Sequence, residues 1–275
     1  MYYDLHIHTN FSDGLDSWQT VLQKAEETNL QLMSITDHDN CDVYFEMQNP
    51  QQYFSGKILT GIEMQAYCKG LSIEILGYGY DIYKMREYLK DLYMPFDKLN
   101  CLVLEKVYEK LVSIGINFAP TVLQDYDPAK HYYSADYLHA QMRKFSQNRA
   151  FVPDEASWQQ DNLFFRLHLT NPNSKFYIHE ADIIPSANKV VDTIHNAGGK
   201  AVLAHVYEYK ENSEIILQEL LNIVDGIECF YPTFTKARRE YLVDLCKKNN
   251  LLITGGSDYH GAKRSNCIGN LCGII

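Results

Sequence analysis

The chain has 275 residues, of which 46% are hydrophobic and 22% are charged, a composition that is typical of a folded globular protein and excludes an intrinsically disordered one. Its formal net charge of -10 argues against an extended nucleic acid as partner, because such contacts need Lys and Arg to neutralise phosphates. The seven cysteines include no CxxC pair, so we expect reduced thiols in a cytoplasmic protein and no thiolate zinc site.

The first predicted element is a strand over residues 2–8. Because strand side chains alternate, His6 and His8 point to the same side, and Asp13 follows five residues later. Two imidazoles and a carboxylate suit a divalent cation, and the alternative is a pair of polar residues on the wet face of an edge strand. No basic and apolar leader precedes this strand, and no apolar run approaches the roughly 20 residues that cross a bilayer, so we expect neither a signal peptide nor a membrane partner.

A strand, helix, strand unit opens the chain, and this unit builds parallel sheets. Asp16 is predicted to cap the helix, and the apolar strand 30–36 ends in Asp37-His38-Asp39. His38 is therefore expected at the carboxyl end of the second strand, as His6 and His8 are expected at the end of the first.

Two acidic residues mark the next two predicted strands. Strand 57–63 ends in Glu63, and Glu74 interrupts the otherwise apolar strand 72–78. A buried and unpaired carboxylate is costly, so Glu74 needs a cation or a hydrogen-bond network, unless it lies in water on an edge strand.

The pattern changes between residues 83 and 181, where helical periodicity replaces the alternation. We predict a helical insertion or cap over residues 97–181, flanked by the two parts of one domain, 1–96 and 182–275. The histidines of this insertion have no ligand-like spacing.

Alternation resumes after the insertion, and polar residues again follow the strands. His205 ends strand 200–205, Glu228 lies at the end of strand 225–229, and the strand over 251–254 leads into Asp258 and His260. In a parallel barrel the carboxyl ends of the strands gather on one face, where active sites lie. Repetition of His, Asp and Glu at nearly every strand therefore predicts a metal centre with imidazole and carboxylate ligands, suited to Zn, Mn or Fe.

The number of candidate ligands exceeds what one ion can bind, so we expect two or three divalent ions. Glu63 is a candidate bridge between two of them, at the spacing of roughly 3.5–4 Å that two-metal hydrolases use.

Five motifs in this order resemble the PHP (polymerase and histidinol phosphatase) family over residues 1–96 and 182–275: His6-Ile7-His8, Thr36-Asp37-His38, Gly61-Ile62-Glu63, Ala204-His205 and Gly256-Ser257-Asp258-Tyr259-His260. The resemblance implies an α/β fold, a distorted seven-stranded (β/α) barrel, and a trinuclear metal centre.

The resemblance also implies a distribution of ligands. One ion would be held by His6, His8, Glu63 and Asp258, a second by Glu63, Glu74 and His205, and a third by Asp13, His38 and His260. Asp37 is expected to orient a ligand histidine.

Two positions depart from the family pattern. Glu74 stands where the family usually has histidine, which should favour Mn or Fe over Zn. Residues 134–136 lack the family's Arg-Pro-His-like element, which leaves the substrate open.

The expected function is a metal-dependent phosphoesterase that hydrolyses a small phosphate ester, such as a nucleotide, a nucleoside bisphosphate or a short oligonucleotide, by a metal-activated hydroxide. Asp13, His38 and His260 are candidates for protonating the leaving group, and Lys263 and Arg264 for binding a substrate phosphate. The alternatives are histidinol phosphate as substrate, hydrolysis of a carbon–nitrogen bond as in amidohydrolases, or a non-catalytic binding module.

Overall fold

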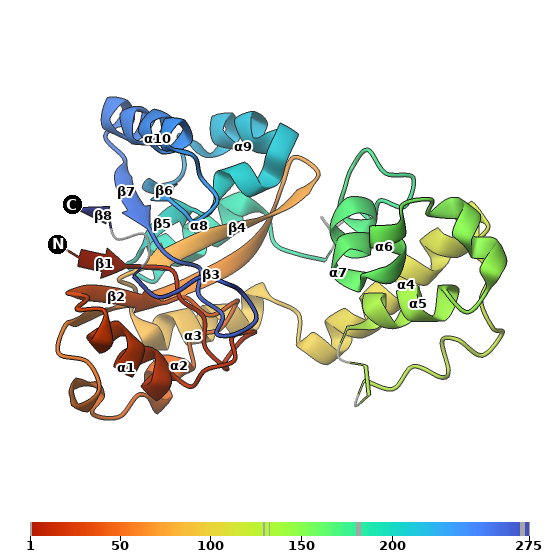
Figure 1. Cartoon of the computed structure of the whole chain (residues 1–275), viewed down its shortest axis with the longest axis horizontal. Helices are drawn as coiled ribbons and strands as arrows, with labels where there is room; N and C mark the ends of the chain where they lie inside the picture. The colour runs from red at the N-terminus through yellow and green to blue at the C-terminus, as the bar shows by residue number, and fades with distance from the viewer. Residues whose placement is uncertain (1, 129, 132, 180–182, 270–272, 275) are drawn as a thin grey trace. The chain divides into compact units, whose positions relative to one another are not determined.

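The computed structural model describes residues 2–128, 130–131, 133–179, 183–269 and 273–274 (Figure 1). Contacts divide the chain into two compact units. We call residues 1–68, 73–93 and 185–275 the barrel unit, and residues 69–72 and 94–184 the insertion unit. The boundary expected between 181 and 182 lies outside the described residues.

The barrel unit is organised around one sheet in which, among the described residues, eight strands follow the order β7-β6-β5-β4-β3-β2-β1-β8. The strands are β1 (Tyr2–Asp4), β2 (Leu32–Ile35), β3 (Lys57–Cys68), β4 (Leu71–Tyr78), β5 (Lys200–Leu203), β6 (Gly226–Phe230), β7 (Leu252–Gly255) and β8 (Gly273–Ile274).

The sheet closes on itself because the segment after β1 joins the end of β7 and the residues that follow it. The amide of Leu5 donates to the carbonyl of Gly255 at 3.1 Å, and the amide of Asp258 donates to the carbonyl of His6 at 2.8 Å. β2 is parallel to β1 and β3, and β6 is parallel to β5 and β7, whereas β4 is antiparallel to β5. The expected distorted seven-stranded (β/α) barrel is confirmed, with β8 as a short addition beside β1.

β3 and β4 differ from the expectation, because they continue into a long hairpin. Lys69 and Gly70 form its turn with φ of 50° and 89°, the left-handed pair that suits a two-residue connection. Glu63 and Glu74 therefore lie inside strands rather than at carboxyl ends. The prediction that a strand ends at Glu63 is wrong, because the hairpin extends both strands beyond the barrel wall.

Helices cover the barrel sheet: α1 (Trp18–Glu27), α2 (Val43–Glu46), α3 (Ile82–Leu92), α8 (Ala187–Asn196), α9 (Ser213–Leu220) and α10 (Lys236–Asn249), with the short 3-10 helices η1 (Pro50–Gln52) and η5 (Val206–Asn212). α1 buries Val21 and Leu22 in one cluster with Met33. Its cap is Ser17, whose hydroxyl accepts from the amide of Thr20 at 3.3 Å, so the prediction of Asp16 as cap is wrong.

The insertion unit is helical and has its own core. It contains α4 (Phe96–Ile114), α5 (Ser134–Met142), η2 (Ser146–Phe151), α6 (Glu155–Gln159), α7 (Asp161–Phe164) and η3 (Phe165–Leu169), drawn in yellow and green in Figure 1. Leu111, Leu138 and Phe164 are among the side chains buried in that core. Within the described residues, no helix combines the length and hydropathy that a membrane crossing needs.

Candidate metal centre

All nine residues predicted as ligands lie together at one end of the barrel. Donor atoms of eight of them, all except His205, form three overlapping groups, and within each group the atoms lie within 4.8 Å of one another. His6, His8, His38, His205, Asp258 and His260 follow strands, Asp13 lies in the loop between β1 and α1, and Glu63 and Glu74 project from the middle of β3 and β4.

The first group is His6, His8, Glu63 and Asp258, all of them buried. Glu63 Oε2 lies 3.1 Å from Nε2 of His6 and 3.1 Å from Nε2 of His8. Asp258 Oδ1 lies 3.3 Å from Nε2 of His8. Two nitrogens and two oxygens thus surround one position, which is the set that the family resemblance implied.

The second group is His8, Asp13, His38 and His260. Asp13 Oδ1 lies 3.1 Å from Nε2 of His260, 3.7 Å from Nδ1 of His8 and 3.8 Å from Nε2 of His38. This second group contains the three residues expected for a third ion, and it also contains His8. The structure therefore gives His8 one nitrogen in each of two groups.

The third group is His38, Glu63 and Glu74. Nδ1 of His38 lies 3.4 Å from Glu63 Oε2 and 3.6 Å from Glu74 Oε1. His205 reaches the same carboxylates, since its Nε2 lies 2.9 Å from Glu63 Oε1 and 3.1 Å from Glu74 Oε2. Glu74 is one-third exposed, so it lies neither on a dry strand face nor fully in water.

The electrostatics of the cluster favour bound positive charge. Burial by itself lowers the pKa of His6 and of His8, but the neighbouring carboxylates outweigh it and raise both, that of His8 to about 9. Burial opposes ionisation of Glu63, yet the surrounding imidazoles hold its pKa well below the ordinary range. The protein thus maintains a dense set of anionic oxygens beside nitrogens that are ready to bind a proton or a cation.

Several buried nitrogen and oxygen atoms of the cluster make no hydrogen bond of acceptable geometry within the described part of the chain. They are His6 Nε2, both ring nitrogens of His8, Asp13 Oδ1 and His260 Nε2. Buried polar atoms are normally satisfied, so such atoms facing one another need a shared partner. Imidazole nitrogens and carboxylate oxygens fit Zn, Mn or Fe, and the residues present therefore fit a divalent metal centre.

Backbone conformation also sets the ligands in place. His205 and Asp258 have φ of 22° and 52°, a region that non-glycine residues rarely adopt and that recurs at functional sites. Gly256 packs against His6, and a Cβ at this position would lie only 2.3 Å from Cβ of His6. The close approach of the two chain segments therefore requires glycine there.

Three residues around the ligands have roles that the sequence did not reveal. Glu228 Oε1 lies 2.9 Å from Nδ1 of His6, and Tyr231 donates to Asp258 Oδ2 at 2.6 Å. The hydroxyl of Tyr209 accepts from the amide of Glu74 at 2.8 Å. Glu228 could have been found as the acidic residue of the predicted strand 225–229, whereas nothing local distinguishes the two tyrosines from others.

Asp37 does not orient a histidine through any hydrogen bond described. It accepts from the amide of Thr9 at 2.7 Å and from the hydroxyls of Thr9 and Ser12 at 2.7 and 2.6 Å. The prediction for Asp37 is wrong, because its oxygens hold the loop that carries Asp13.

Lys263 and Arg264 lie beside the cluster, but each already has a partner. Lys263 donates to the carbonyl of Asp13, and the guanidinium of Arg264 pairs with Asp258 Oδ2. Both remain partly open to solvent, Arg264 with 36% of its side chain exposed.

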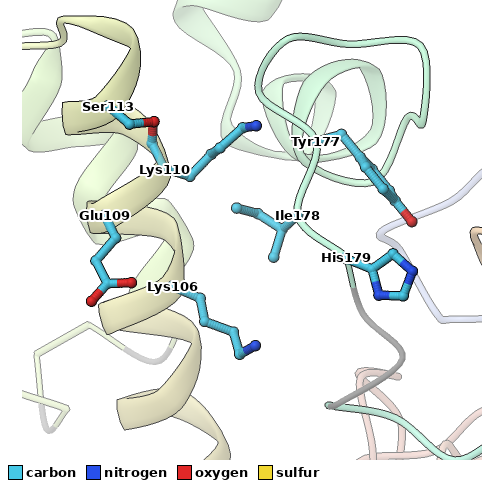
Figure 2. Close-up of a pocket in the computed structure, with 7 residues that line it drawn as sticks. All are labelled: Lys106, Glu109, Lys110, Ser113, Tyr177, Ile178 and His179. Carbon is cyan, nitrogen blue, oxygen red and sulfur yellow. The ribbon is translucent and has the colours of Figure 1, made fainter.

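A pocket with a volume of about 350 Å³ lies within the insertion unit, apart from the predicted metal ligands. Figure 2 shows it between α4, which contributes Lys106, Glu109, Lys110 and Ser113, and the segment Tyr177, Ile178 and His179. It contains none of the predicted site residues, and one carboxylate beside two lysines is a poor cation site.

Comparison with known proteins is consistent with this geometry. The family model described as PHP domain matches residues 4–160. A 5'-3' exoribonuclease of Haemophilus influenzae is 26% identical over 262 residues, covering 94% of this chain and 89% of that protein. A phosphoribosyl 1,2-cyclic phosphate 1,2-diphosphodiesterase of Eggerthella lenta is 26% identical over 272 residues, covering 94% of each.

Solved structures share the fold. A protein of Bifidobacterium adolescentis, provisionally named a metal-dependent phosphoesterase, superposes with a TM-score of 0.65 at 22% identity, covering 98% of this chain and 91% of that one. An amidohydrolase of Chromobacterium violaceum, solved with sulfate, superposes with a TM-score of 0.68 at 19% identity over 100% and 92% of the two chains.

Proposed function

The chain belongs to the PHP domain family and is a metal-dependent phosphoesterase, and we propose that it hydrolyses a phosphoester of a nucleotide, a nucleoside bisphosphate or a short oligonucleotide. One observation supports this most. The three ligand groups are contiguous, because they share His8, His38 and Glu63, and only the side of the cluster formed by Asp13, His38 and Glu74 is partly exposed.

The proposal assigns the nine residues to two or three divalent ions. The first group would hold one ion, and Glu63 would bridge it to an ion between His205 and Glu74. A third would lie among Asp13, His38 and His260. The two acidic residues of the Glu63 and Glu74 subsite favour Mn or Fe there over Zn.

Bound cations would neutralise the phosphoryl oxygens and lower the pKa of water to near neutrality. The chain's own residues would orient the ester at the exposed side. Where the centre holds only two ions, we assign proton transfer to the leaving group to His38 and Asp13, whose side chains are 32% and 38% exposed, before His260, which is 1% exposed. Lys263 and the partly exposed guanidinium of Arg264 would bind a substrate phosphate.

The relatives narrow the substrate class. They include enzymes named for a cyclic phosphodiester and for RNA, so a phosphodiester or terminal phosphate on ribose is the common element. Net charge still favours short substrates over long ones, because a chain of charge -10 repels a polyanion away from its metal centre. In this proposal the barrel parts 1–96 and 182–275 hold the metals.

The test is a substrate panel on protein of known metal content. We expect phosphate release from nucleoside bisphosphates or short oligoribonucleotides with Mn²⁺, loss of activity with chelator, and recovery with added Mn²⁺. Activity on an amide panel without phosphate release would favour the amidohydrolase alternative. Phosphoesterase activity that persists in a protein freed of metal would refute the proposal.

A further inference from the structure

We propose that Glu228 positions His6 and His205 for cation binding without touching the cation itself. Glu228 lies on β6 and is fully buried. Its Oε1 lies 2.9 Å from Nδ1 of His6, and its Oε2 accepts from the backbone amide of His205 at 2.8 Å. One carboxylate therefore joins a histidine of the first group to the histidine that reaches Glu63 and Glu74. The inference rests on the proposed cation binding.

The first role of Glu228 concerns the tautomer of His6. A carboxylate has only acceptor atoms, so the ring nitrogen that faces it must carry the hydrogen. Nε2 of His6, which lies 3.1 Å from Glu63 Oε2, is then the ring nitrogen that can give up its proton to a cation. A metal binds a histidine through its unprotonated nitrogen, so Glu228 presents the nitrogen that a cation needs.

The second role concerns the backbone at His205. This residue has φ 22° and ψ 50°, a sparsely populated conformation, and its side chain depends on that conformation to reach the carboxylates. Its buried amide has Glu228 as acceptor. Without that acceptor the amide would be unsatisfied, and the chain would favour a conformation that withdraws the ring from Glu63 and Glu74.

Both oxygens of Glu228 face N–H groups, that of the His6 ring and that of the His205 backbone, which separates its role from that of a ligand. The change Glu228→Gln keeps its size but leaves one acceptor oxygen for two N–H groups. The amide nitrogen then faces either the ring of His6, favouring the tautomer that cannot bind, or the amide of His205. Either arrangement weakens one subsite while the packing is preserved.

The test measures Mn²⁺ binding to chelator-treated protein by titration calorimetry, with metal content after dialysis as a second reading. For Glu228→Gln we expect affinity about 10- to 100-fold weaker than wild type. The control is Glu26→Gln, because Glu26 also accepts from a backbone amide and a hydroxyl, both of Ser55, but lies on α1. This control should bind as wild type does.

Nitrogen-15 spectra of the histidine rings show which ring nitrogen of His6 carries the proton, and this measurement does not depend on the Glu228→Gln variant. In wild type, the proton should reside on Nδ1 of His6 after Mn²⁺ is replaced by diamagnetic Zn²⁺. Wild type that binds no cation would refute the proposed function. Wild type that binds while Glu228→Gln binds equally well, or a His6 ring protonated on Nε2, would refute the positioning role alone.

Discussion

The metal-free protein should lose stability as pH rises, and His8 should account for much of the loss. Glu63 and Asp258 outweigh the effect of burial and raise the pKa of His8 from 6.5 to about 9. The charged ring therefore stabilises the fold fully below about pH 6.5, and this contribution disappears as pH rises through about 9. A rise of that size corresponds to about 3 kcal/mol.

The assay is urea unfolding of chelator-treated protein at pH 6.0 and pH 9.5. Trp18 lies in the barrel unit and Trp158 in the insertion unit, so Trp158→Phe lets fluorescence report the barrel alone. His8→Asn should reduce the pH difference in the free energy of unfolding by about 3 kcal/mol relative to its parent. The control is His131→Asn, in the insertion unit, which should leave the pH difference in the free energy of unfolding of the barrel unit unchanged.

Bound cations should reverse the trend. A cation displaces the histidine protons, so its affinity should rise over the same pH range, and the loaded protein should gain stability relative to the metal-free one. A metal-free protein with equal stability at pH 6.0 and 9.5, or a His8→Asn variant with the full pH dependence, would refute this account of the cluster.

Three further outcomes follow. Tyr231→Phe removes the hydroxyl that binds Asp258 and should weaken Mn²⁺ binding about tenfold or more by calorimetry, whereas Tyr207→Phe should not. Gly256→Ala places a Cβ 2.3 Å from that of His6 and should lower the free energy of unfolding by about 1–3 kcal/mol in urea; an unchanged midpoint would contradict the packing. Leu111→Ala should destabilise the insertion unit by about 2–5 kcal/mol, read from Trp158 fluorescence, and an unaltered transition would show that this core is not cooperative.

Much of the centre could be predicted from local pattern. His6 and His8 share a side because strand side chains alternate, and His38, His205 and Asp258 converge because parallel strands bring their carboxyl ends to one face. These are properties of short segments, and so they are visible without knowledge of the partners. The ligand chemistry, imidazole and carboxylate without thiolate, depends on residue type alone.

The tertiary structure decided what depends on partners distant in the chain. Glu63 and Glu74 lie inside a hairpin because β3 and β4 extend beyond the barrel wall, and no local signal gives that length. Glu228 joins His6 to the amide of His205 because the sheet order places β6 beside β5 and the closure of the sheet brings β1 to β7. Local sequence specifies which groups a strand presents, whereas the order and closure of the strands specify which groups meet.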